Sequence, residues 1–164
     1  MILIYIKLFD EIILFFIIFY AMKNEILKVG DLYHIGIAVQ DSEKTAKLYT
    51  ETMGLRIEHD EVVMDQGVRA IMLVPQKSKS AAIELLEPVI PESPITKYIE
   101  KKGEGMHHIC YLVDDIKIGI SHLKNLGIEM IDNEPRVGLN NTLVAFAHPK
   151  SMNSVLIELA QKIT

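Results

Sequence analysis

A repeat with an offset of 74 residues is the strongest constraint on the fold of this chain. The segment that begins at His34, HIGIAVQDSEKTAKLYTETMGLRI, and the segment that begins at His108, HICYLVDDIKIGISHLKNLGIEM, share one order: histidine, apolar strand, acidic helix start, amphipathic helix and glycine. Glu84 in AAIELLEP and Glu158 in VLIELAQK keep the same offset. Such a repeat indicates two copies of one supersecondary unit that bury their apolar faces together.

Within each copy, the pattern predicts a strand, a helix and three further strands, a βαβββ module. The first helix should begin near Asp41 or Ser42 and the second near Asp115, because short polar side chains cap helices at such positions. The inner faces of the two helices are predicted to carry Ala46, Tyr49 and Met53 in the first and Ile116, Ile120 and Leu123 in the second.

A short helix is predicted between the copies. SPITKYIEKKG places Ser93 as the N-cap, Pro94 at the first helical position and Gly103 at the helix end. We therefore expect one domain over residues 30–164, with a first module at about 31–90, a connecting helix at about 93–103 and a second module at about 105–161.

Composition narrows the function classes. A chain of 164 residues with 49% hydrophobic residues can bury one substantial core. Its net charge of −5 and the lack of a lysine or arginine block argue against a nucleic-acid partner. The single cysteine, Cys110, excludes an internal disulfide and a cysteine-based zinc motif, and it favours a reducing, cytoplasmic location.

The first 21 residues differ from the rest of the chain. They are strongly apolar, but Lys7, Asp10 and Glu11 interrupt them, so the segment is a poor membrane span. It also lacks the features of a secretory or mitochondrial signal. We interpret residues 1–21 as an extension that arises from a mis-assigned start, with translation beginning at Met22; a membrane or packing anchor and a targeting signal are the alternatives.

Strand alternation predicts which side chains face a common cavity. Because neighbouring residues of a strand point to opposite faces, His34 should lie opposite the branched side chains that pack under the helix. The same reasoning places His108 on the cavity side and turns His107 away from it. Glu84 and Glu158 are likewise expected to face the cavity.

Two histidines and two glutamates in equivalent places predict a metal site. A carboxylate flanked by AAI and LL is costly to bury alone, and a cation removes that cost. Imidazole and carboxylate donors suit Zn, Co, Ni, Mn or Fe(II). Taken singly, each of these residues could instead be a hydrogen-bonded histidine or a salt-bridged glutamate; their common repeat offset favours a metal. The predicted ligands are His34, Glu84, His108 and Glu158.

These residues resemble the vicinal oxygen chelate (glyoxalase) superfamily. Within it, HIGIAV, IELLEP, DEVVMDQGV, NEPRVG, SPITKYIEKKGEGMHHI and AFAHPKS resemble the methylmalonyl-CoA epimerase family, over about Leu32 to Gln161. The resemblance implies an α+β fold in which two βαβββ modules form a cupped, eight-stranded mixed sheet. It also implies a homodimer, a CoA thioester substrate, a role in propionate metabolism and a divalent ion, with Co as the first choice and Zn, Ni, Mn or Mg as alternatives.

The implied activity is interconversion of (2R)- and (2S)-methylmalonyl-CoA through a metal-stabilised enolate. Glu158 is the first choice as catalytic base and Glu84 the second. For contacts to the CoA or the carboxylate, the candidates are Lys150, Ser151 and Arg136. Two features depart from the family: PKSMNSVLIEL replaces a glycine-rich approach to the last strand, and Ala70 stands where some members carry an acid proposed as a base.

Two other functions are compatible with this fold. A glyoxalase I type lyase would use the same four ligands on a glutathione hemithioacetal. A metal-free binding module of the same fold would need none of them as ligands, since one fold hosts several functions.

Overall fold

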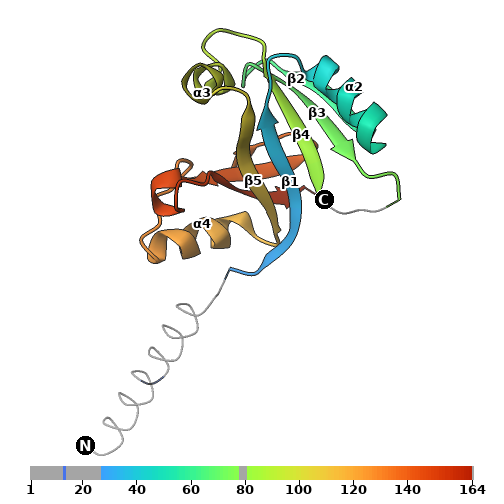
Figure 1. The fold of residues 1–164 in the computed structure, drawn as a ribbon. Helices are drawn as coiled ribbons and strands as arrows, with labels where there is room; N and C mark the ends of the chain where they lie inside the picture. Colours follow the sequence, from blue (N-terminus) through green and yellow to red (C-terminus); the bar gives the residue numbers. More distant parts are fainter. Residues whose placement is uncertain (1–12, 14–26, 78–80, 164) are drawn as a thin grey trace, which may run out of the picture.

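A computed structural model of the chain describes residue 13, residues 27–77 and residues 81–163 (Figure 1). The interpretation of residues 1–21 as an extension, and of Met22 as the start, therefore falls outside the described residues except at position 13. Within the described part of the chain, none of the helices is both long enough and apolar enough to cross a membrane.

One curved sheet joins all the strands, in the order β2-β3-β4-β1-β5-β8-β7-β6. The prediction of two βαβββ modules in an eight-stranded mixed sheet is confirmed. The first module is β1 (Val29–Ala38), α2 (Ser42–Met53), β2 (Arg56–Val63), β3 (Val68–Val74) and β4 (Ala82–Pro88). After the connecting helix α3 (Pro94–Lys102), the second is β5 (Gly105–Val113), α4 (Ile116–Asn125), β6 (Arg136–Val137), β7 (Thr142–Ala147), the 3₁₀ turn η1 (Pro149–Ser151) and β8 (Ile157–Lys162).

The centre of the sheet holds the two modules together. β1 and β5 pair antiparallel, and each is flanked on its other side by the last strand of its own module in parallel register, β4 beside β1 and β8 beside β5. In the central pair, Gly36 lies opposite His108 and His34 lies opposite Cys110. This arrangement brings the equivalent strands of the repeat together around a local twofold relation.

The pairing of β1 with β5 shows three register shifts, and two of them are β-bulges at equivalent places of the repeat. Between Leu32 and His34, β1 carries one extra residue, Tyr33, and between Met106 and His108, β5 carries one extra residue, His107. A bulge leaves the extra residue unpaired and re-aims side chains beside it. The residue that precedes each repeat histidine therefore departs from simple strand alternation.

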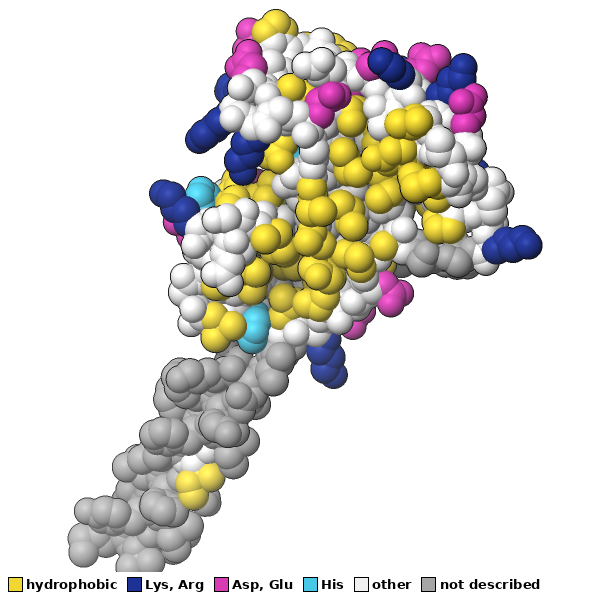
Figure 2. Space-filling model, in the orientation of Figure 1, with side chains coloured by type: hydrophobic (Ala, Val, Ile, Leu, Met, Phe, Trp, Pro, Cys, Tyr) yellow, Lys and Arg dark blue, Asp and Glu magenta, His cyan; other side chains and the backbone are white. Residues whose placement is uncertain are grey.

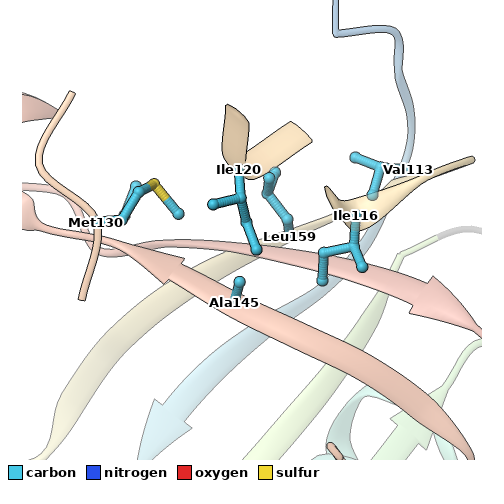
Figure 3. Packing of buried hydrophobic residues seen from close by; sticks show 7 residues of the cluster. Val113, Ile116, Ile120, Met130, Ala145 and Leu159 are labelled. Atoms are coloured by element: carbon cyan, nitrogen blue, oxygen red, sulfur yellow. The ribbon is translucent and has the colours of Figure 1, made fainter. Parts of the chain in front are cut away.

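The module helices α2 and α4 pack on one face of the sheet as their sequence patterns predict. α2 is capped by Asp41, whose side chain accepts a hydrogen bond from the backbone N–H of Lys44, and α4 is capped by Asp115. Figure 3 shows Ile116 and Ile120 of α4 directed toward the strands beneath, where Leu159 and Ala145 complete a buried cluster. Met53 is an exception among the predicted inner residues, because it ends α2 and is 57% exposed.

The repeat extends to the hydrogen bonds that fasten each helix to the sheet. The backbone N–H of Ser42 donates to Oε2 of Glu87 at 3.2 Å, and that of Ile116 donates to Oε1 of Gln161 at 2.9 Å. Donors and acceptors are each 74 residues apart in the sequence. In both modules, the last strand thus supplies a side-chain oxygen to the first turn of the helix, which satisfies a backbone group that the helix itself leaves unpaired.

Candidate functional site

The four predicted ligands meet at the centre of the sheet. They come from four neighbouring strands, His34 from β1, Glu84 from β4, His108 from β5 and Glu158 from β8. All four are buried, with exposed fractions between 3% and 6%. Charged and polar side chains are seldom this buried without partners, so the cluster requires an explanation in terms of its own contacts.

The donor atoms of the four side chains converge. Nε2 of His34 lies 2.9 Å from Nε2 of His108, 3.0 Å from Oε2 of Glu158 and 3.3 Å from Oε2 of Glu84. Nε2 of His108 lies 3.1 Å from Oε2 of Glu158 and 3.7 Å from Oε2 of Glu84. The structure therefore joins the two halves of the repeat into one cluster, as the sequence predicts.

The geometry of this cluster fits a divalent ion. Nitrogen and oxygen donors that bind zinc at about 2.0–2.2 Å lie roughly 2.8–3.6 Å apart for near-octahedral to tetrahedral angles, and the observed separations run from 2.9 to 3.7 Å. Two imidazole nitrogens and two carboxylate oxygens suit a borderline metal. A cation would also neutralise the negative charge that two buried glutamates bring.

The two glutamates occupy different electrostatic environments. Burial raises the pKa of Glu84. Burial also acts to raise the pKa of Glu158, but hydrogen bonds from His108 and His34 outweigh it and hold that pKa well below its usual range. For His34, burial favours the neutral ring, yet the nearby charges of Glu84 and Glu158 prevail and raise the pKa. Glu158 is thus the more strongly stabilised anion of the pair.

Gly36 makes room for one of the imidazoles. A Cβ built on this glycine would lie 2.3 Å from Cε1 and 2.5 Å from Nδ1 of His108, far inside van der Waals contact. The His108 ring therefore lies directly over the backbone of the neighbouring strand. Sequence reasoning missed this role, although the HIGIA pattern places Gly36 on the same strand face as His34.

His107 differs from its prediction. Alternation turned it away from the cavity, but its side chain lines the same cavity as His108, and the two Nδ1 atoms lie 3.0 Å apart. The bulge in β5 is the physical reason, because the extra residue breaks the period of two. Burial, reinforced by the charge of His108, lowers the pKa of His107 to about 4, so that its ring is neutral at physiological pH.

Tyr33 is a cavity residue that sequence reasoning missed. It lines the cavity from the bulge in β1, and its hydroxyl accepts a hydrogen bond from Nδ2 of Asn140 at 3.0 Å. Burial raises the pKa of its phenol. Only the repeat offset between Tyr33 and His107 could have linked these two positions in advance.

A cavity of about 310 Å³ opens over the four donors. Its wall is largely apolar and includes Val68, Met72, Leu86, Ile95, Leu139 and Phe146. A volume of this size, with few polar groups at its base, is typical of small-molecule sites. The cavity gives a ligand direct access to the buried cluster.

The proposed substrate contacts do not all lie at this cavity. Arg136 lines it, with the guanidinium carbon 5.3 Å from the ring centroid of Phe146 and Nε 3.3 Å from Oδ1 of Asp132. Lys150 and Ser151 lie on η1 and are not among the residues that line the cavity. The hydroxyl of Ser151 instead accepts a hydrogen bond from the backbone N–H of Glu129.

The cupped sheet and its central cluster define a class, the Glyoxalase/Bleomycin resistance protein/Dioxygenase superfamily, whose sequence profile matches residues 33–146. An ethylmalonyl-CoA/methylmalonyl-CoA epimerase of Cereibacter sphaeroides is 38% identical over 135 residues, 81% of this chain and 98% of the relative. The mitochondrial methylmalonyl-CoA epimerase of Mus musculus is 34% identical over 140 residues, which cover 85% of this chain and 77% of the relative. Within that superfamily, the chain belongs to the methylmalonyl-CoA epimerase family.

A solved structure agrees with this placement. A Streptomyces coelicolor methylmalonyl-CoA epimerase in complex with 2-nitronate-propionyl-CoA has a TM-score of 0.78 to this chain at 33% identity. The match covers 84% of this chain and 97% of that one. The likeness therefore extends over both modules.

Proposed function

We propose that this chain is an epimerase that interconverts (2R)- and (2S)-methylmalonyl-CoA. The observation that carries the proposal is the cluster of His34, Glu84, His108 and Glu158 at the base of an apolar cavity. Relatives that match most of the chain are epimerases of this substrate class. The alternative of a glyoxalase I type lyase would require a glutathione hemithioacetal in the same cavity.

The reaction needs a base on one face of C2 and a proton source on the other. Removal of the C2 proton leaves its electron pair in the enolate of the thioester, and return of a proton to the opposite face gives the other epimer. Glu158 is our choice for a base, because its lowered pKa keeps the carboxylate ionised and it lies at the base of the cavity. Glu84 is our choice for the second group, since it enters the cluster from the opposite flank of β1.

A divalent ion would be held by the two histidines and the two glutamates, with cobalt as our first choice and zinc, nickel, manganese or magnesium as alternatives. When bound, such an ion supplies Lewis-acid stabilisation of the negative charge that develops on oxygen as the enolate forms. The residues of the chain shape the site: the wall of the cavity is largely apolar, and the lack of a side chain at Gly36 lets the His108 ring lie against β1.

Arg136 is our choice for the contact to a substrate anion. It is the arginine that lines the described cavity, and its packing on Phe146 fixes the guanidinium at the wall. A planar, forked guanidinium suits a carboxylate or a phosphate. Lys150 and Ser151, which lie outside the cavity lining, remain proposals for contacts to the CoA portion.

The test is proton exchange at C2. The protein, loaded with Co²⁺, is incubated with (2S)-methylmalonyl-CoA in deuterated water, and we expect deuterium at C2 together with the (2R) epimer. Glu158→Gln should reduce the exchange by at least about a hundredfold, the scale of a lost general base. His122→Gln, a change on α4 away from the cavity, is the matched control. No exchange by the native chain, or turnover of methylglyoxal with glutathione instead, would overturn the proposal.

The homodimer is a separate proposal. Figure 2 shows hydrophobic side chains gathered across the middle of one face of the molecule. Ile35 and Ile109 pair across β1 and β5 and are only half-buried on the helix-bearing side of the sheet. Contiguous apolar surface of this kind commonly marks an interface. We expect light scattering to give the mass of two chains for the native protein and the mass of one chain for the Ile109→Glu variant.

We also propose a cytoplasmic location for the protein.

A further inference from the structure

The contact between His107 and His108 connects a bulge to the metal site. Their Nδ1 atoms lie 3.0 Å apart, within hydrogen-bond distance, while Nε2 of His108 faces the other donors of the cluster. The rings meet nearly at right angles, at 84°. The two nitrogens of His108 therefore have separate partners, one in the cluster and one beside it.

This geometry constrains where the protons lie. An imidazole that binds a metal through Nε2 keeps its proton on Nδ1. Nδ1 of His107 must then accept that proton in a hydrogen bond, which requires His107 to carry its own proton on Nε2. We propose that His107 is a positioning residue, which accepts a hydrogen bond from Nδ1–H of His108 and so holds the His108 ring with its Nε2 lone pair facing the metal. The inference rests on the proposed metal site.

The surroundings of His107 suit this role. Its ring lies against that of Tyr98 from α3, with centroids 4.8 Å apart and planes at 77°. The hydroxyl of Tyr98 donates to the backbone oxygen of Met106, the residue before the bulge. The connecting helix and the bulge together therefore fix the acceptor, rather than leaving it on a freely rotating side chain.

The equivalent position in the first module lacks such an acceptor. Tyr33 occupies the matching bulge, but its hydroxyl is hydrogen-bonded to Asn140. Nδ1 of His34 is buried and has no hydrogen-bond partner among the described residues. The two repeat histidines thus differ: His108 is oriented by a neighbour and His34 is not. Partners of this kind typically change metal affinity by 10- to 100-fold.

Nuclear magnetic resonance tests the hydrogen bond directly. In Zn²⁺-loaded protein labelled with ¹⁵N-histidine, we expect a scalar coupling between Nδ1 of His107 and Nδ1 of His108, carried by the shared proton. The Nδ1 proton of His34 should show no such coupling. This measurement needs neither a substitution nor enzymatic activity, so it is independent of the proposed function. A His108 Nδ1 proton without coupling to His107 would overturn the inference.

Zn²⁺ titration tests whether the hydrogen bond from His108 to His107 strengthens metal binding. His107→Phe keeps an aromatic ring against Tyr98 but removes the acceptor, and it should weaken Zn²⁺ binding by about 10- to 100-fold. Tyr33→Phe, the matched change in the other bulge, should leave Zn²⁺ affinity within about twofold. Circular dichroism verifies that both variants are folded. Equal Zn²⁺ affinities for His107→Phe and the native protein would overturn the inference. If the native protein shows the coupling but has no epimerase activity, that result would count against the proposed function alone.

Discussion

Gly36 and His108 face each other across β1 and β5 in direct register, and the imidazole occupies the space that a side chain at position 36 would take. The position of the His108 ring in the second module thus depends on the absence of a side chain at Gly36 in the first. The strand pairing places His108 in the cluster only because its neighbour has no Cβ.

Gly36→Ala should displace the His108 ring. The new methyl group would lie 2.3 Å from Cε1, so the ring must move away from the other donors. We expect metal affinity to fall about tenfold or more, the effect of a misoriented ligand, and stability to fall by about 1–3 kcal/mol from overpacking. Gly30→Ala on the same strand, where the nearest contact is 3.3 Å, is the control. Calorimetric titration with Co²⁺ compares the two; unchanged affinity in Gly36→Ala would contradict the expectation.

His108→Ala should abolish stoichiometric metal binding. It removes one of the four convergent donors and leaves Glu158 with a single imidazole partner. Elemental analysis of untagged protein after dialysis against Co²⁺ or Zn²⁺ measures the loss. His122→Ala removes a histidine from α4 and should keep the full metal content. A metal-free binding module would instead show no stoichiometric ion in either protein.

Metal affinity should fall as the pH falls. A ligand must lose its proton before it binds a metal, and the charges of Glu84 and Glu158 raise the pKa of His34 above its ordinary value of about 6.5. Affinity should therefore begin to fall above that value and then drop roughly tenfold per pH unit for one competing proton. Co²⁺ titrations between about pH 5.5 and 8 provide the measurement, and a flat profile would count against His34 as a ligand.

In the metal-free protein, the contribution of His34 to the free energy of unfolding should decrease as the pH rises, whereas metal affinity should increase. Because the pKa of His34 is higher in the folded than in the unfolded chain, its contribution to stability is fully present below the unfolded pKa. It is lost as the pH rises through the folded value. Denaturant unfolding with and without a chelator, across the same pH range, separates the two effects.

Gln161→Leu should loosen α4. The change removes the oxygen that accepts the N–H of Ile116, and an unsatisfied, partly buried donor costs about 1–3 kcal/mol. Gln76→Leu, at an exposed position after β3, is the control and should change the free energy of unfolding by less than about 0.5 kcal/mol. Urea unfolding gives both values. Equal stabilities for the two variants would mean that the repeat in hydrogen bonding has no energetic role.

Ile120→Ala should be among the costly core changes. The side chain is 4% exposed and packs on Leu159 and Ala145 beneath α4, so its removal should reduce the free energy of unfolding by about 2–5 kcal/mol. Leu126→Ala, just beyond α4 at 66% exposure, should cost far less. Thermal unfolding ranks the two; similar losses would indicate that the cluster is not the core of the second module.

Much of the site could be predicted because the repeat offset and the alternation of strand side chains can both be read directly from the sequence. The offset between His34 and His108 paired the ligands, and alternation oriented Glu84 and Glu158 without any knowledge of the fold. Alternation was wrong for His107 because it assumes unbroken pairing, and a bulge is a property of two strands together. Met53 was misplaced because it ends α2, where the sheet no longer covers that face of the helix.

The sequence by itself determined the two modules, their helix caps and the four residues that meet at the centre, since these follow from patterns local to each copy. Only the tertiary structure decided how the copies contact each other. The pairing of β1 with β5 set Gly36 beneath His108, created the bulges at Tyr33 and His107, and gave one repeat histidine a hydrogen-bond partner that the other lacks. The physical reason is that register and bulges depend on contacts between strands far apart in the chain, which no single segment of sequence specifies.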